Sequence, residues 1–295
     1  MDFAIYIISA IAIMVVLLVG QQLLLFDSGI LSLGTPAFFV CGAYTSAILA
    51  KHAGCPVMVS ILLASITGPV LALLVGCPWL RRLRSDFFAV ATLALAQATV
   101  VVLRAAAPGG LSGMAGVPPF ATQWVLSIPP VTAGMALTVT AAAASLTGIH
   151  WLRQRRIGAI IVAVRVDENA AAALGIRPVL VKLQAFLLSS FLAALAGGMQ
   201  AHLLGVVEPR MASISMTVVL LVGTILSGRK AWGCVFGATF VVLMPELLQR
   251  LFLLRSEPHW RVFLASQAIY GAIIIALVFS LPWLQQPGAS RSGHA

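Results

Sequence analysis

The sequence predicts an all-α, polytopic bundle of transmembrane helices. Of its 295 residues, 61% are hydrophobic and only 9% are charged, and the mean hydropathy is +1.05. Soluble domains carry about a quarter charged residues. Apolar runs of about 20 residues, the length that crosses a bilayer, recur along the chain. Because these runs do not alternate strictly between apolar and polar residues, they exclude a transmembrane β-barrel.

The expected spans follow one another with short connections. The run 3–26 has no basic residue before it and is long for the apolar part of a signal peptide, so it is predicted to remain as the first helix. The stretch 26–50 contains Asp27, Pro36 and several glycines and is predicted to be kinked or broken, which would add a short extra helix. The predicted spans are 3–26, 30–50, 57–80, 87–107, 131–151, 183–207, 213–228, 232–250 and 262–284.

Basic residues predict the orientation, because cytoplasmic loops are enriched in Lys and Arg. The turn 81–84 (RRLR) and the basic loop 152–182 are separated by two spans, so both can face the cytoplasm, and the uncharged loop 108–130 then faces outside. The same count puts the N-terminus outside and the basic pair 229–230 inside. The segment 250–261 disagrees, because its arginines fall on the predicted outer face. A miscounted span or arginines that snorkel to the interface would explain this.

One transmembrane domain, 1–284, is therefore expected, with the loop 152–182 outside the membrane and 285–295 as a short disordered tail. The net charge of +10 is interpreted as a marker of membrane orientation rather than of nucleic-acid binding, since the basic residues lie mostly in short loops. The four cysteines lack metal-like spacing and are interpreted as small apolar residues.

Several kinds of chemistry have no motif in this sequence. It contains no G-x-x-x-x-G-K-[ST] loop for nucleotide phosphates, no H-E-x-x-H and no Cys/His cluster for zinc. His202 alone lies inside a predicted span and is interpreted as a packed or hydrogen-bonded residue. Glu246 is the one candidate for a carboxylate within a span, where such groups usually couple transport to ions. The chain is therefore predicted to be no enzyme and to lack an ATPase motif of its own. A proton- or sodium-driven carrier usually needs more than one such carboxylate, so the energy for any active transport must come from elsewhere.

Small residues recur at helical spacing in two places. The span 183–207 carries one stripe at positions 190, 194, 198 and 202 and another at 189, 193, 197 and 201. Such stripes let helices approach closely in lipid, and internal packing is favoured over a substrate path. The residues predicted to serve close packing are Ser190, Ala194, Gly197, Gly198, Gly233 and Gly237.

The stretch 165–178, RVDENAAAALGIRP, has the features of a short helix outside the membrane. Asp167 and Glu168 precede an alanine run, where a helix N-terminus favours negative charge, and Gly175 and Pro178 follow as stop signals. A free helix of two turns is not stable in water, so it is expected to dock on this chain or on another. The alternative, a solvated connector that only marks the cytoplasmic side, stays open on composition alone.

A resemblance to a known family favours docking. The segment 155–209 reads RRIGAIIVAVRVDENAAAALGIRPVLVKLQAFLLSSFLAALAGGMQAHLLGVVEP. It resembles the permeases of ABC importers for branched-chain amino acids, most closely the M-type member of their two paired permeases. The matching residues are Arg165, Asp167, Glu168, Gly175, Ile176, Lys182, Ala185, Phe186, Gly197, Gly198 and Pro209.

Three further segments resemble the same family in the same order, so the resemblance covers nearly the whole chain. They read GILSLGTPAFFVCGAYTSAIL, RLRSDFFAVATLALAQ and GATFVVLMPELLQ. The chain departs from the family pattern at LSGRKAWG, where Arg229 and Lys230 stand among the glycines, at FDSG before the second span, and at Ala159.

The resemblance implies that 165–178 is the coupling helix, which would sit in a groove of a cytoplasmic ATPase subunit. Arg165, Asp167 and Glu168 would make the polar contacts, Ala171 and Ala172 the close approach, and Gly175 the turn out. It also implies a second homologous permease, two cytoplasmic ATPase subunits that bind the ATP, a periplasmic substrate-binding protein and an inner-membrane location, with no cofactor in this chain. The residues assigned to ATPase coupling are Arg165, Asp167, Glu168, Asn169, Ala171, Ala172, Gly175 and Ile176.

Two rival functions are weighed against the importer permease. A stand-alone secondary transporter or channel would work without an ATPase and would depend on Glu246 or another buried carboxylate. A membrane enzyme acting on lipid or prenyl substrates would need Asp, His or Glu residues clustered at one membrane face, and the sequence shows no such cluster.

Overall fold

The chain is almost entirely helical, as its composition predicts. The structure, a computed structural model, describes residues 2–82, 85–106, 113–120, 130–253 and 268–272. The described residues include five helices that are long and apolar enough to cross a membrane. The predicted all-α, multi-pass membrane fold is therefore confirmed. Two compact units make up the chain, Met1–Val242 and Leu243–Ala295, and the features described below lie in the first.

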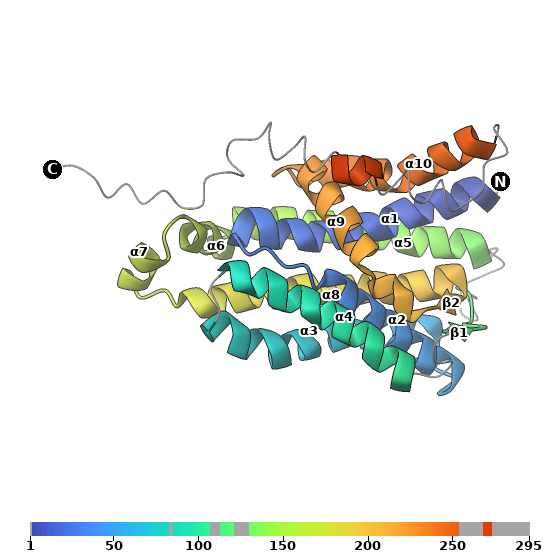
Figure 1. The fold of residues 1–295 in the computed structure, drawn as a ribbon, viewed down its shortest axis with the longest axis horizontal. Coiled ribbons are helices and arrows are strands. Elements are labelled where there is room, and N and C mark those ends of the chain that lie inside the picture. The colour runs from blue at the N-terminus through green and yellow to red at the C-terminus, as the bar shows by residue number, and fades with distance from the viewer. Residues whose placement is uncertain (1, 83–84, 107–112, 121–129, 254–267, 273–295) are drawn as a thin grey trace. The chain divides into compact units, whose positions relative to one another are not determined.

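The long helices follow the order expected from hydropathy, and two helices outside the spans, at 156–166 and 168–173, lie between the fifth and the sixth of them (Figure 1). They are α1 (Asp2–Gln22), a π-helical turn (Leu23–Ser28), α2 (Thr35–Lys51), α3 (Val57–Arg82), α4 (Ser85–Ala106), β1 (Met114–Ala115), α5 (Pro130–Gln154), α6 (Arg156–Val166), α7 (Glu168–Ala173), α8 (Pro178–Leu204), β2 (Val206–Val207), a 3-10 turn (Pro209–Ala212), α9 (Ile214–Ser227) and α10 (Gly233–Leu253).

Every predicted span up to residue 250 is present as a helix, with some shifted ends. The helix α8 begins at Pro178 rather than at 183, because proline is well accommodated in the first turn of a helix. The helix α6 lies where only a basic loop was expected, so that prediction was incomplete. Most of the predicted span 262–284 lies outside the described residues, as do most of the basic segment 250–261 and the tail 285–295.

The break predicted between the first two spans is present. The π-helical turn ends at Ser28, the segment 29–34 is not helical, and α2 starts only at Thr35. Buried side chains from neighbouring helices bind the freed backbone groups. Gln21 Nε2 donates to the Ser32 carbonyl at 2.6 Å, and Leu33 N donates to Thr92 Oγ1 of α4 at 3.0 Å. This is how irregular backbone is tolerated at membrane depth, where no water is available to hydrogen-bond it.

The helix α8 lies at the centre of the core, where it contacts α1, α2 and α3. Phe186 of α8 is fully buried and meets Phe38 of α2 and Phe88 of α4 edge to face, with ring centroids 5.4 and 5.3 Å apart. Edge-to-face aromatic pairs add to the stabilisation from burial alone. These contacts make α8 the element that fixes α2, α3 and α4 relative to one another.

The predicted interpretation of His202 as a hydrogen-bonded core residue is confirmed. Its side chain is 1% exposed; Nε2 lies 2.9 Å from Ser46 Oγ of α2, and Nδ1 lies 2.6 Å from the Pro118 carbonyl. Because a carbonyl only accepts, Nδ1 must carry the proton in this arrangement. The same region contains the antiparallel pairing of β1 with β2. His202 therefore ties the described part of the loop after α4 to the ends of α2 and α8.

The two ends of the bundle formed by residues 2–242 differ. In Figure 1, α6 and α7 lie at one end and the β1–β2 pair lies at the other, where α1 also begins. The turn 228–230 belongs to the α6–α7 end, since Arg153 Nη1 at the end of α5 donates to the Arg229 carbonyl at 2.9 Å. The N-terminal helix thus starts opposite the basic segments 152–182 and 229–230, in the relative arrangement predicted from the loop charges.

Candidate functional site

The short helix α7 is fixed at both ends by its own chain. Asp167 is extended and Oδ1 accepts from the amides of Asn169 at 2.8 Å and Ala170 at 3.0 Å, which makes it the N-cap. At the other end Gly175 has φ of 81°, and its amide donates to the Ala172 carbonyl at 2.9 Å. The Ile176 amide donates to the Ala171 carbonyl at 3.1 Å. Together these bonds form a Schellman motif, so the helix begins and ends where the sequence predicts.

The charged residues expected to contact an ATPase have partners within this chain. Asp167 caps α7, Glu168 forms an ion pair with Lys182 of α8, and Arg165 Nη1 donates to the Phe26 carbonyl. Burial and the nearby charge of Arg229 both lower the pKa of Arg165. Of these contacts, the Glu168–Lys182 pair joins α7 to α8. The predicted role of all three side chains in contacting another protein is still untested.

Two large apolar side chains are exposed next to α7. Val166, just before the N-terminus of α7, is 81% exposed, and Leu174, just after its C-terminus, is 82% exposed. Asn169 and Ala172 are also exposed, whereas Ala171 is 3% exposed and faces the chain itself. The sequence pattern did not single out Val166 and Leu174, because isolated apolar residues in a charged segment are common on protein surfaces.

Replacing Asp167 with alanine is expected to destabilise α7 by about 1 kcal/mol, because two amides lose their acceptor. Asp167→Asn keeps an acceptor at the same position and is the matched control. Amide hydrogen exchange at residues 169–173 should speed up about fivefold in the alanine variant and stay close to the parent rate in the asparagine variant. Equal exchange in all three proteins would show that the cap does not hold the helix.

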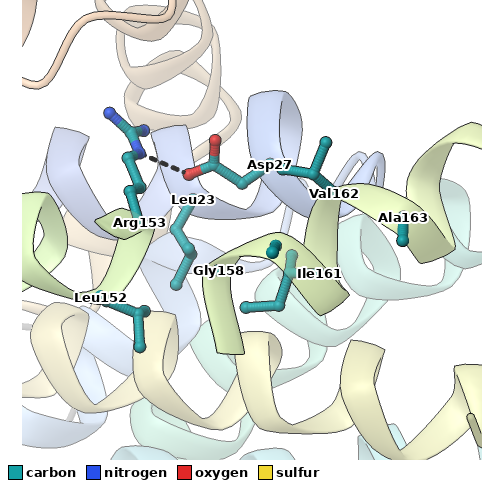
Figure 2. Close-up of a pocket in the computed structure, with 9 residues that line it drawn as sticks. Leu23, Asp27, Leu152, Arg153, Gly158, Ile161, Val162 and Ala163 are labelled. Carbon is teal, nitrogen blue, oxygen red and sulfur yellow. Dashed lines mark hydrogen bonds and ion pairs between the residues drawn. The ribbon is translucent and has the colours of Figure 1, made fainter. Parts of the chain in front are cut away.

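Gln22, Asp27 and Arg153 form a polar cluster near the N-terminal end of α6. We call these three residues the Asp27 cluster. Arg153 Nε donates to Asp27 Oδ2 at 2.8 Å (Figure 2). Arg153 Nη2 donates to Gln22 Oε1 at 3.0 Å. Gln22 Nε2 donates to the carbonyls of Gly228 at 2.6 Å and Lys230 at 2.9 Å. Gln22 and Asp27 are buried. The cluster therefore joins α1, the π-helical turn and the end of α5 to the turn between α9 and α10.

Next to this cluster is a cavity of about 440 Å³. Figure 2 shows Asp27 and Arg153 at its edge, with Leu23, Leu152 and one side of α6 around it. Within the described ranges, no three His, Cys, Asp or Glu side chains come together as metal ligands would. Apart from the Asp27–Arg153 pair, the cavity is lined by apolar residues and glycine.

The small residues of α8 lie at close helix contacts. Gly197 meets the Phe39 backbone of α2, and Ala194 meets Gly42 of the same helix. Ser190 meets Gly68 of α3. A Cβ added at Gly197 would overlap the Phe39 carbonyl, whereas one added at Gly198 would make ordinary contacts of 3.4 Å with Ser46 and 3.6 Å with Ile61. Ser189 of the second stripe meets Gly20 of α1, so the two stripes pack against three helices. Gly197 marks a tighter approach than Gly198.

Gly233 and Gly237 at the start of α10 lie against α9. A Cβ at Gly233 would overlap the Ser227 carbonyl, and one at Gly237 would overlap the Gly223 carbonyl and Ser227 Oγ. Backbone contacts this close allow small residues only. The positions predicted to serve close packing therefore lie at helix contacts, while their effect on assembly stays a prediction.

Comparisons with known proteins cover almost the whole chain. Residues 3–280 match the family described as the permease component of the branched-chain amino acid transport system. Two relatives, the high-affinity branched-chain amino acid transport system permease proteins LivM of Salmonella typhimurium and Escherichia coli, are each 27% identical over 262 and 264 residues. These matches cover 80% and 81% of this chain but 61% and 62% of the relatives. No solved structure gives a significant match. Because the family model covers nearly all of its residues, the chain belongs to the branched-chain amino acid transport permease family.

Proposed function

We propose that this chain is the transmembrane permease subunit of an ATP-driven importer for branched-chain or related small amino acids. It would form the translocation path with a second homologous permease in the bacterial inner membrane. Two cytoplasmic ATPase subunits would bind and hydrolyse the ATP, and a periplasmic binding protein would deliver the substrate. The family match over residues 3–280 supports this role, and the sequence has no phosphate-binding loop of its own. No nucleic acid is involved.

The observation that carries the proposal is the construction of α7. A six-residue helix is not stable alone in water, yet this one is capped at both ends and held to α8 by the Glu168–Lys182 pair. It lies outside the apolar spans, in the basic segment that the charge rule places in the cytoplasm. It still leaves Val166 and Leu174 exposed. A preformed helix with uncovered apolar side chains is suited to enter a groove on another protein.

Co-purification from the native membrane tests the proposal. The tagged chain should carry with it an ATPase that contains a phosphate-binding loop and a second permease of the same family. A chain that is purified alone and still moves leucine across a vesicle membrane would contradict the importer function. It would instead favour a stand-alone transporter, with Glu246 as the first residue to replace.

Charge reversal at Glu168 separates two roles for this residue. Glu168→Lys places a cation next to Lys182 and is expected to abolish coupled uptake while the protein stays in the membrane. The swap Glu168→Lys with Lys182→Glu restores the pair inside the chain. Exposed ion pairs contribute at most about 1 kcal/mol, so loss of this pair alone is not expected to unfold the protein. Recovery of uptake in the swap assigns Glu168 to holding α7, whereas continued loss assigns it to contact with the ATPase.

A further inference from the structure

The turn 228–230 is held in place by side chains from distant parts of the chain. Its three consecutive carbonyls all accept hydrogen bonds from the Asp27 cluster, two from Gln22 and one from Arg153. Gly228 has φ of 60°, a conformation that favours glycine, so the α9 helix ends here with a sharp change of direction. The position of this turn relative to α1 and α5 therefore depends on two side chains.

Arg153 is the centre of the arrangement. Its guanidinium donates to Asp27 in the π-helical turn, to Gln22 in α1 and to the Arg229 carbonyl. A planar guanidinium presents its donors in a fixed fork, so it can orient three acceptors at once in a way that an ammonium cannot. Asp27 is a buried acid at the end of a span, and such an acid needs a cationic partner to stay there. Separating these groups leaves a charge uncompensated, so the cluster is expected to move as one unit.

The same cluster is connected to α7 through α6. One residue, Asp167, separates α6 from α7. At the far end of α6, Arg165 donates to the Phe26 carbonyl, next to Asp27, and its aliphatic part lies where a Cβ on Gly29 would sit. A displacement of α7 would therefore be passed to α6 and from there to the π-helical turn.

The cavity beside α6 affects how this displacement is transmitted. Gly158, Ile161 and Val162 of α6 line the cavity of about 440 Å³ (Figure 2), although α6 also contacts the π-helical turn. Close-packed interfaces resist small shifts, whereas a helix beside an unfilled space can shift without overlap. The cavity gives part of α6 room to shift, while the hydrogen bond from Arg165 to the Phe26 carbonyl keeps its end attached to the π-helical turn.

We infer that Gln22, Asp27 and Arg153 are positioning residues for coupled transport, which pass a displacement of α7 and α6 on to the turn between α9 and α10. The inference rests on the proposed function, because it assumes that an ATPase displaces α7. It adds the route inside this chain: the movement reaches α9 through hydrogen bonds to three backbone carbonyls.

The test uses the complete transporter in proteoliposomes and compares uptake of labelled leucine with ATP hydrolysis. Arg153→Lys keeps the positive charge but loses the planar arrangement of N–H donors. Gln22→Met keeps the size of the side chain but loses the amide that donates to the two carbonyls. Each variant is expected to bind the ATPase normally and to hydrolyse ATP, while leucine taken up per ATP falls about tenfold. The double variant should fall no further than the single ones, because both break the same connection.

Arg155→Lys is the matched control. Arg155 lies two positions from Arg153 but stacks on Trp151, with its guanidinium carbon 4.4 Å from the ring centroid, and should keep the parental ratio. The inference would be overturned if both Arg153→Lys and Gln22→Met took up as much leucine per ATP as the parent. It would also be overturned if both variants were lost from the membrane, because the cluster would then have a purely structural role. Failure of the proposed function is distinguishable, since the parent complex itself would then contain no ATPase.

Discussion

Replacing Gly197 with alanine is expected to remove most of the folded protein from the membrane. The added methyl group would overlap the Phe39 carbonyl and approach the Ala43 amide, and both are backbone atoms of α2 that cannot move aside alone. Overpacking usually costs about 1–3 kcal/mol, and an overlap with backbone falls at the upper end of that range. Thermal unfolding followed by size-exclusion fluorescence should show a lower midpoint and a reduced amount of monodisperse protein.

Gly198 provides the matched control for this experiment. It is the next residue on the same helix, and a methyl group there makes contacts of 3.4 and 3.6 Å, which are ordinary van der Waals distances. Gly198→Ala should therefore keep the parental stability, while Gly198→Leu should be disruptive, as its place in the packing stripe predicts. If both alanine variants were equally stable, α2 and α8 would not approach each other as closely as described.

Replacing Val166 and Leu174 together with aspartate is expected to weaken binding to the partner ATPase by about a hundredfold or more. Both side chains are more than 80% exposed in the isolated chain. Full burial of a valine or leucine contributes about 1.5–3 kcal/mol, and burying a carboxylate without a partner adds a penalty. Neither side chain caps α7 or forms an ion pair in the described structure. Leu174 is the C-cap residue through its backbone amide, which aspartate keeps, so the helix itself should persist. Co-purification of the ATPase at graded salt concentrations measures the loss.

Asn169→Asp is the control for charge in this second experiment. Asn169 is exposed in the first turn of α7, where a negative charge favours the helix. The variant adds a negative charge to the exposed surface of α7 without removing an apolar side chain. If it weakened ATPase binding as much as the double variant, the interaction would depend on charge rather than on the two apolar residues.

The sequence was sufficient to predict the class of fold and the ends of α7. Spans follow from long apolar runs, and the short helix follows from Asp167 at one end and Gly175 at the other, because these signals act within a few neighbouring residues. The helix α6 was missed for the same reason. Arginines at both of its ends made RIGAIIVAVRV resemble part of a basic loop. In the structure α6 packs against α8 and the π-helical turn, and the local sequence pattern does not predict these contacts.

The Asp27 cluster could not be predicted, because its members are far apart in the sequence. Gln22 and Arg153 are 131 positions apart, and Gln22 and Gly228 are 206 apart. Hydropathy gives the order of spans but not which helices become neighbours. Asp27 was visible as an acid at a span edge, but nothing in the local pattern named Arg153 as its partner. The exposure of Val166 and Leu174 was likewise missed, since it depends on how α7 packs on α6 and α8.

The segment 29–34 has no regular secondary structure, but its hydrogen-bonded amides should exchange with solvent as slowly as those of the protein core. The Ile30 amide donates to the Leu24 carbonyl at 2.9 Å, and the Leu33 amide donates to Thr92 Oγ1 at 3.0 Å. Opening either bond in hydrocarbon leaves a polar group without water to replace its partner. Deuterium should therefore enter these amides about as slowly as those of the helices on either side, and faster only when α1 and α4 separate. The irregular segment 29–34 would then be a rigid connection between the π-helical turn and α2 rather than a flexible one.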